Sequence, residues 1–194
     1  MANREHWNVK DSTAAWPKLV GHPQEDEKET QEQAQLLFSV QRGLRCLEIG
    51  AGVGRLLKKA SEHFILALGV DYSEDLVRIS ANYLKGYIRC CVVLNDGLHL
   101  PFAEGTFGFV YSFTCFQHMP DLETIQANLR EAYRVLTPGG LFKMQTVCGK
   151  PDPSLYDGWV FPSPEHLWDE LAAVGFRKES LYLKDFWIWV TGRK

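Results

Sequence analysis

Between residues 44 and 147, short apolar runs alternate with stretches of helical periodicity, and this alternation restricts the possible folds more than any other feature of the chain. An apolar run of strand length followed by an amphipathic stretch is typical of a strand–helix unit. We expect strands at Leu44–Ile49, Phe64–Val70, Tyr87–Leu94, Phe107–Phe113 and Leu141–Val147. Between them we expect helices at Arg55–His63, Ser73–Leu84 and Asp121–Leu136. Such alternation predicts a parallel sheet with helices on its faces.

The pattern changes near the C-terminus. Ser163 and Pro164 predict the start of a helix that ends at Gly175. Two strands are expected next, Lys178–Leu183 and Phe186–Thr191, and the gap between them allows only an antiparallel hairpin. The sequence therefore predicts an α/β fold, a doubly wound and mostly parallel seven-stranded sheet with a C-terminal antiparallel hairpin strand.

Composition excludes several classes of function. The net charge of −3, with Lys and Arg scattered along the chain, gives no general attraction to a phosphate backbone, so no nucleic-acid partner is expected. No apolar window approaches the length of about 18 residues that a membrane span needs, and no signal peptide is evident. The five cysteines lack CxxC spacing, which predicts reduced thiols in the cytoplasm and no bound metal.

Three glycines at alternate positions, Gly50, Gly52 and Gly54, follow the first predicted strand. Doubly wound sheets bind ligands at the carboxyl ends of their strands, and glycine there allows a sharp turn and a close approach of the backbone to the ligand. A dinucleotide fingerprint, GxGxxG, that starts at Gly50 would need a glycine at position 55, whereas this chain has Arg55. The glycines therefore argue against a nicotinamide oxidoreductase.

The segment Glu48-x-Gly50-x-Gly52-x-Gly54 resembles the first motif of the class I, seven-stranded, Rossmann-like S-adenosylmethionine-dependent methyltransferases. Further segments resemble that family in the same order along the chain: 69–73, 95–97, 100–102 with 107–110, 116–121 and 134–140. The resemblance covers about residues 40 to 148. It is closest to the small-molecule branch, which includes methyltransferase type 11 and the ubiquinone and menaquinone biosynthesis enzymes.

The resemblance implies S-adenosyl-L-methionine as cofactor, S-adenosyl-L-homocysteine as product, and a role for each strand-end acid. It implies that Asp71 accepts hydrogen bonds from the ribose hydroxyls and Asp96 from the adenine amine, while Glu48 orients the glycine loop or attracts the methionine ammonium. Each also has a purely structural alternative, since Asp71 could cap a helix and residues 95–97 could form an ordinary turn. The other residues expected at the cofactor are Gly50, Ala51, Gly52, Gly54, Tyr72, Asn95, Gly97, Phe113, Gln117 and His118.

His118 is the candidate general base, because the resemblance places it beside the methyl group that is transferred. A base is needed only if the acceptor must lose a proton, and the alternative is that His118 packs against the cofactor. Aromatic residues near the N-terminus and after the fifth strand are expected to surround the acceptor: Trp7, Trp16, Tyr156 and Trp159. They favour a small apolar or aromatic acceptor, although each could equally be a packing residue.

We expect one methyltransferase domain over residues 1–194, acting as a monomer or homodimer. Within it, residues 1–40 would form an N-terminal helical arm or lid, 41–148 the cofactor-binding core, and 149–194 the acceptor-side loop, helix and hairpin. A non-catalytic or regulatory module that binds S-adenosylmethionine would show the same motifs. Only turnover of the cofactor separates these two hypotheses.

Overall fold

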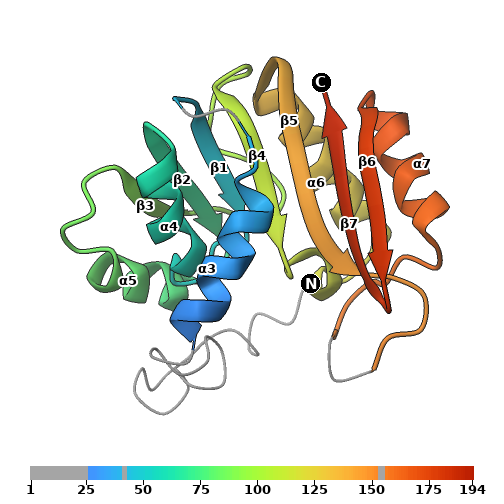
Figure 1. The fold of residues 1–194 in the computed structure, drawn as a ribbon, viewed down its shortest axis with the longest axis horizontal. Coiled ribbons are helices and arrows are strands. Elements are labelled where there is room, and N and C mark those ends of the chain that lie inside the picture. The colour runs from blue at the N-terminus through green and yellow to red at the C-terminus, as the bar shows by residue number, and fades with distance from the viewer. Residues whose placement is uncertain (1–25, 41–42, 153–155) are drawn as a thin grey trace. The chain divides into compact units, whose positions relative to one another are not determined.

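Strands β1 (Arg45–Ile49), β2 (Leu66–Asp71) and β3 (Cys90–Leu94) run parallel in the order β3-β2-β1 in the computed structural model of the chain (Figure 1). The structure describes residues 26–40, 43–152 and 156–194. These residues fall into two compact units that divide between Leu94 and Asn95. The predictions for Trp7 and Trp16 lie outside the described residues.

The first unit also contains helices α3 (Asp26–Leu37), α4 (Arg55–His63) and α5 (Glu74–Tyr83). Helix α4 is amphipathic and buries Leu56, Leu57 and Ala60, as its 3-4 spacing predicts. Helix α3 is mostly polar and makes its apolar contact at its end, where Phe38 packs edge-on against Phe64 with ring centroids 5.4 Å apart.

The second unit contains β4 (Phe107–Phe113), β5 (Leu136–Val147), β6 (Arg177–Lys184) and β7 (Trp187–Arg193) in the order β4-β5-β7-β6. Strands β4 and β5 are parallel, whereas β7 is antiparallel to both of its neighbours. The predicted antiparallel hairpin is therefore confirmed.

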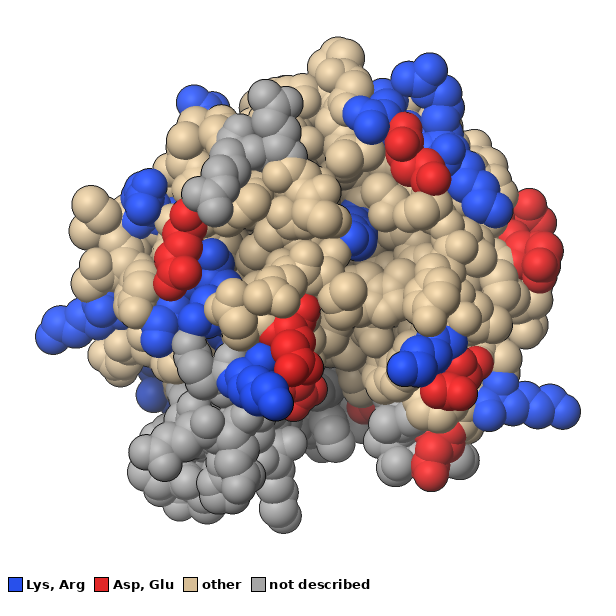
Figure 2. All heavy atoms as spheres, viewed as in Figure 1, with Lys and Arg blue, Asp and Glu red and all other residues tan. Residues whose placement is uncertain are grey.

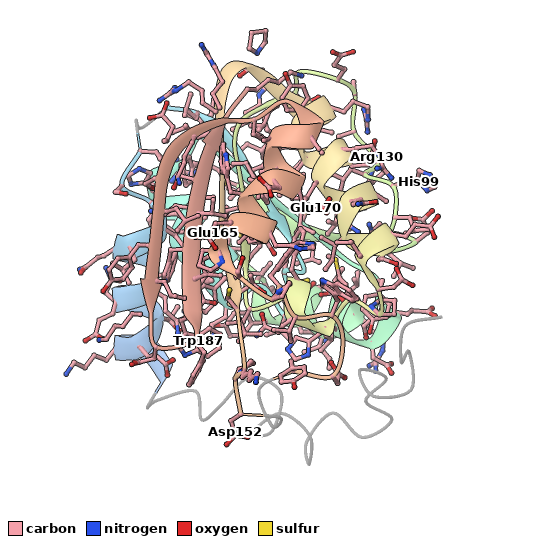
Figure 3. All side chains as sticks on the ribbon, turned by 90° about the vertical axis from the view of Figure 1, so that its right-hand side faces the viewer. His99, Arg130, Asp152, Glu165, Glu170 and Trp187 are labelled. Atoms are coloured by element: carbon pink, nitrogen blue, oxygen red, sulfur yellow. The ribbon has the colours of Figure 1, made fainter. Side chains whose placement is uncertain are left out.

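Helices α6 (Leu122–Val135) and α7 (Pro164–Val174) lie on one face of these four strands (Figures 1 and 3). The predicted N-caps are confirmed, because Asp121 accepts a hydrogen bond from the Thr124 amide at 2.8 Å and Ser163 accepts one from the His166 amide at 3.2 Å. Glu170, which lies between the two helices in Figure 3, accepts a hydrogen bond of 2.8 Å from Gln126 and so joins α7 to α6.

Two predicted strand boundaries differ from the structure by three or more residues. Strand β3 begins at Cys90 rather than Tyr87, because the chain turns between Leu84 and Cys90 and leaves Ile88 97% exposed. Strand β5 begins at Leu136 rather than Leu141, so the segment 137–140 belongs to the strand. The cause is a long-range pairing: Gly139 donates to the carbonyl of Lys194, and Lys194 donates to that of Gly140, each at 3.0 Å.

The predicted fold class is confirmed, since all seven strands form and β7 is the reversed one. In the ranges that the structure describes, no helix has the length and apolarity needed to cross a membrane.

Candidate functional site

The turn from β1 into α4 is built from glycines in the left-handed region of backbone conformation. Gly50, Gly52 and Gly54 have φ values of +75°, +55° and +87°, which side chains with a Cβ rarely adopt. A Cβ on Gly54 would lie 2.8 Å from Leu84, whereas one on Gly52 would have no atom within 4 Å. Gly54 is thus required for packing, while Gly52 presents bare backbone to open space.

Asp71 connects this glycine turn to the start of α5. Its Oδ2 accepts the Gly52 amide hydrogen at 2.8 Å, and its Oδ1 accepts that of Ser73 at 2.9 Å. Burial raises the pKa of Asp71, and the hydrogen bonds from the Ser73, Gly52 and Tyr72 amides oppose that rise. Each carboxylate oxygen can accept a second hydrogen bond, so this structural role leaves capacity for a ligand.

The other predicted residues of the first unit lie around the same turn. Ala51 donates its amide hydrogen to the Val70 carbonyl at 3.0 Å, and a Cβ on Gly69 would lie 2.5 Å from that of Ala51. Glycine at position 69 therefore lets the turn lie against β2. Glu48 is buried on β1 opposite Gly69, and Tyr72 is half-buried after β2.

Arg55 extends toward α3. Its Nη1 donates to the hydroxyl of the buried Thr30 at 2.9 Å. The structure thus gives this guanidinium a hydrogen-bond partner within the first unit.

In the second unit, Asp96 holds the turn that follows β3. Its Oδ1 accepts the amide hydrogens of Leu98 and His99 at 2.9 and 2.7 Å, and its Oδ2 lies 2.7 Å from His99 Nδ1. The hydrogen bond from the His99 side chain, helped by those from the His99 and Leu98 amides, outweighs the effect of burial and lowers the pKa of Asp96 to about 2. Asp96 is therefore a carboxylate at neutral pH, with an exposed side chain that can accept from a ligand amine.

Helix α6 fixes the position of this turn through polar side chains spaced three residues apart. Asn128 donates to the Gly97 carbonyl at 2.8 Å, and Glu131 accepts the Leu100 amide hydrogen at 2.7 Å. Arg134 donates to Glu131 and to the carbonyls of Leu100 and Phe102 at 2.6 to 3.0 Å. Sequence reasoning missed these three side chains, although their spacing on one face of a predicted helix was visible.

Residues Gln117 and His118 lie in a short 3₁₀ turn, η1 (Phe116–His118), just after β4. Gln117 is buried, and its Oε1 accepts a hydrogen bond from the Thr146 hydroxyl at 3.2 Å. His118 is partly exposed, and its Nδ1 lies 2.6 Å from Asp157 Oδ1. Thr114, which joins β4 to this turn, has a φ of +49°, a conformation that is uncommon outside glycine.

The segment that contains Asp157 lies directly on this turn. The Gly158 amide donates to the Gln117 carbonyl at 3.0 Å, and the Trp159 amide donates to that of Met119 at 2.7 Å. A Cβ on Gly158 would lie 2.1 Å from the Met119 carbonyl oxygen, so only glycine allows this contact. Two of the predicted acceptor residues, Tyr156 and Trp159, are half-buried here, and among the described residues the Trp159 indole nitrogen has no hydrogen-bond partner.

Comparison with known families gives a match over the middle of the chain. A family described as "Methyltransferase domain" matches residues 47–144, just over half of the 194 residues. The 24-methylenesterol C-methyltransferase 2 of Oryza sativa subsp. japonica is 30% identical over 141 residues, covering 70% of this chain and 38% of that protein. The demethylmenaquinone methyltransferase of Staphylococcus saprophyticus is 30% identical over 107 residues, covering 54% of this chain and 45% of that one.

One further relative is named for action on tRNA rather than on a small molecule. The probable tRNA methyltransferase 9B of Mus musculus is 35% identical over 106 residues, which cover 55% of this chain and 22% of that protein. The chain thus spans less than half the length of each of these three relatives.

Solved structures give the fold over almost the whole chain. A structure described as a SAM dependent methyltransferase from Aquifex aeolicus is 17% identical, covers 91% of this chain and 95% of its own, and has a TM-score of 0.72. With the family match, this similarity leads to one conclusion: the chain belongs to the methyltransferase-domain family, the S-adenosylmethionine-dependent methyltransferases of Rossmann-like fold.

Proposed function

We propose that the chain transfers a methyl group from S-adenosylmethionine directly to a small apolar or aromatic acceptor. The observation that carries the proposal is the arrangement after β4, where His118, Asp157 and the half-buried Trp159 lie together in the second unit. This arrangement combines the His118–Asp157 pair with the indole N–H of Trp159, which donates a hydrogen bond to no described residue. Such a mixture of apolar surface and a few polar groups is typical of small-molecule sites.

The residues of the first unit fit the proposed cofactor. Bare backbone at Gly52 allows close approach of a ligand, and the buried Asp71 and Glu48 supply carboxylates but no positive charge. We assign to Asp71 the ribose hydroxyls, in addition to its bonds to the Gly52 and Ser73 amides. Gly50, Ala51, Gly54 and Tyr72 shape the turn around it.

In the second unit we assign the adenine amine to Asp96, whose carboxylate is ionised at neutral pH and held by its own turn. Asn95 and Gly97 complete that turn, since Asn95 donates to the His99 carbonyl at 3.2 Å. We place Phe113 and Gln117 beside the methionine part of the cofactor, and His118 beside the methyl group that is transferred.

When bound, S-adenosylmethionine supplies a methyl group that its sulfonium has already activated. The protein then has to align the acceptor with the methyl carbon and exclude water, an effect that reaches about 7–11 kcal/mol in favourable intramolecular reactions. His118 takes a proton only if the acceptor must lose one, and Asp157 fixes the orientation of its ring.

The five cysteines, which are all described and all free, fit a reducing cytoplasm.

The test is to incubate the purified chain with S-adenosylmethionine and single acceptors, namely a sterol, a reduced quinone, a simple phenol and transfer RNA. Formation of S-adenosylhomocysteine is measured by mass spectrometry. We expect product with at least one of the small apolar acceptors and none with transfer RNA. Product with transfer RNA alone contradicts the proposed acceptor class, and binding of S-adenosylmethionine without product in any sample supports a non-catalytic module.

A further inference from the structure

A buried hydrogen-bond acceptor without a partner lies on the face of β4, β5 and β7 that is opposite α6 and α7. Phe142 of β5 points toward the helices, where it stacks on Phe176 with centroids 5.4 Å apart. Because side chains alternate along a strand, Gln145 points to the opposite face. Gln145 is only 5% exposed, and among the described residues its Oε1 has no hydrogen-bond partner.

Two aromatic residues flank Gln145 across the sheet. Its neighbours on the adjacent strands are Phe113 of β4 and Trp189 of β7, and residues paired in this way point to the same face. The two rings lie with centroids 5.7 Å apart and are only half-buried. Trp187, on the same face, lies at the hairpin end of β7 (Figure 3). The two rings therefore contact each other beside Gln145 and give its orphan oxygen apolar surroundings.

The charge on this face restricts what the oxygen can bind. Lys143, two residues before Gln145 on β5, places its Nζ 5.9 Å from the centroid of the Trp189 ring. Figure 2 shows a largely uncharged surface over β4, β5 and β7, with blue Lys or Arg atoms near its middle. A neighbouring ammonium repels a protonated amine but not a neutral group, so the donor that suits Gln145 is a neutral one such as a hydroxyl.

We propose that Gln145, Phe113 and Trp189 recognise the methyl acceptor, a planar apolar molecule with a hydroxyl group that donates to Gln145 Oε1. This inference rests on the proposed function and adds to it the chemistry of the substrate. A buried acceptor without a partner is unfavourable, and a ligand hydroxyl removes that penalty, so the site selects for the hydroxyl. Phe113, which we place beside the cofactor, then also borders the acceptor.

The experiment compares two probes with the same ring system, 2-naphthol and 2-methoxynaphthalene, of which only the first can donate. Dissociation constants are measured by tryptophan fluorescence and NMR for the wild-type chain, Gln145→Met and the matched control Gln31→Met, an exposed glutamine of α3. The wild type and the control should bind 2-naphthol about tenfold more tightly than its methyl ether. In Gln145→Met the dissociation constant of 2-naphthol should rise to that of 2-methoxynaphthalene, and the dissociation constant of the ether should not change.

The variant Trp189→Leu and the ligand S-adenosylhomocysteine distinguish failure of the proposed acceptor site from failure of the proposed function. Trp189→Leu should weaken both probes and leave their ratio unchanged, and it reports on the site even if Gln145→Met unfolds. An equal affinity of the wild type for both probes overturns the proposed site, because water alone then satisfies the oxygen. Calorimetry with S-adenosylhomocysteine on the same samples tests the proposed function independently: no binding to the wild type contradicts that function, whatever the naphthol ratio.

Discussion

The imidazole of His118 and the carboxylate of Asp157 meet at 2.6 Å although the two residues lie 39 positions apart in the chain. The pair joins the turn after β4 to the segment before α7. Two backbone hydrogen bonds support it, because Gly158 and Trp159 donate to the carbonyls of Gln117 and Met119. A residue proposed as a general base is thus held by a carboxylate whose position depends on a glycine next to it.

Replacing His118 by alanine should leave the affinity for S-adenosylhomocysteine unchanged and alter turnover only if the acceptor must lose a proton. Calorimetry measures the affinity, and a turnover assay measures the rate with whichever acceptor of the panel above gives product. Asp157→Asn is the matched variant, since it keeps a hydrogen-bonding group but removes the charge beside the ring. Loss of cofactor affinity in His118→Ala would instead identify His118 as a residue that packs against the cofactor.

Gly158→Ala should lower the free energy of unfolding by about 1–3 kcal/mol, the usual effect of forcing extra atoms into a packed site. The added Cβ meets backbone atoms of His118 and Met119 that cannot move independently. Urea denaturation measures the change. Gly149→Ala is the control, because position 149 has a φ of +81° in open space and tests backbone strain without a clash. Equal stability of Gly158→Ala and the wild type would show that the segment does not pack on the turn.

Asp71→Ala should weaken binding of S-adenosylhomocysteine by about 2–3 kcal/mol, the scale for removing a charged hydrogen-bond partner. The same change frees the amides of Gly52 and Ser73, so stability has to be measured beside affinity. Ser73→Ala separates the two effects, because it removes the cap on Leu76 and should lower stability but not affinity. Unchanged affinity in Asp71→Ala would exclude Asp71 from the cofactor site.

The pKa of Asp96, about 2, predicts a specific acid titration. Because this pKa lies below the unfolded value of about 3.9, the contribution of Asp96 to stability is complete above the unfolded value and is lost as the pH falls through about 2. Carbon NMR of the carboxyl group should show a midpoint near 2 in the wild type. In His99→Ala the midpoint should rise toward 3.9, since His99 supplies the largest stabilising contact. A wild-type midpoint near 3.9 would contradict the Asp96–His99 pairing.

Local patterns in the sequence were sufficient for most of the fold. The alternation of apolar runs and helical periods predicted the first five strands, and the two closely spaced apolar runs at the C-terminus predicted the last two. Short-range caps such as Asp121 and Ser163 fixed helix starts within a residue. These features could be predicted because periodicity and capping depend on neighbours within about four residues. The glycine turn was visible for the same reason, since a left-handed backbone requires glycine locally.

Tertiary structure decided which partner each polar side chain has. Nothing local indicated that Arg55 bonds to Thr30 or that the segment 137–140 pairs with Lys194. Nor did anything local indicate that Gln145 Oε1, beside two aromatic rings, has no hydrogen-bond partner among the described residues. The same holds for Asp157 beside His118. A hydrogen bond between residues tens of positions apart depends on how the strands and loops pack. The type of a polar residue does not by itself specify which distant residue it will bond to. The sequence by itself determined the elements and the bare turn, and the packing of those elements determined the polar contacts around them.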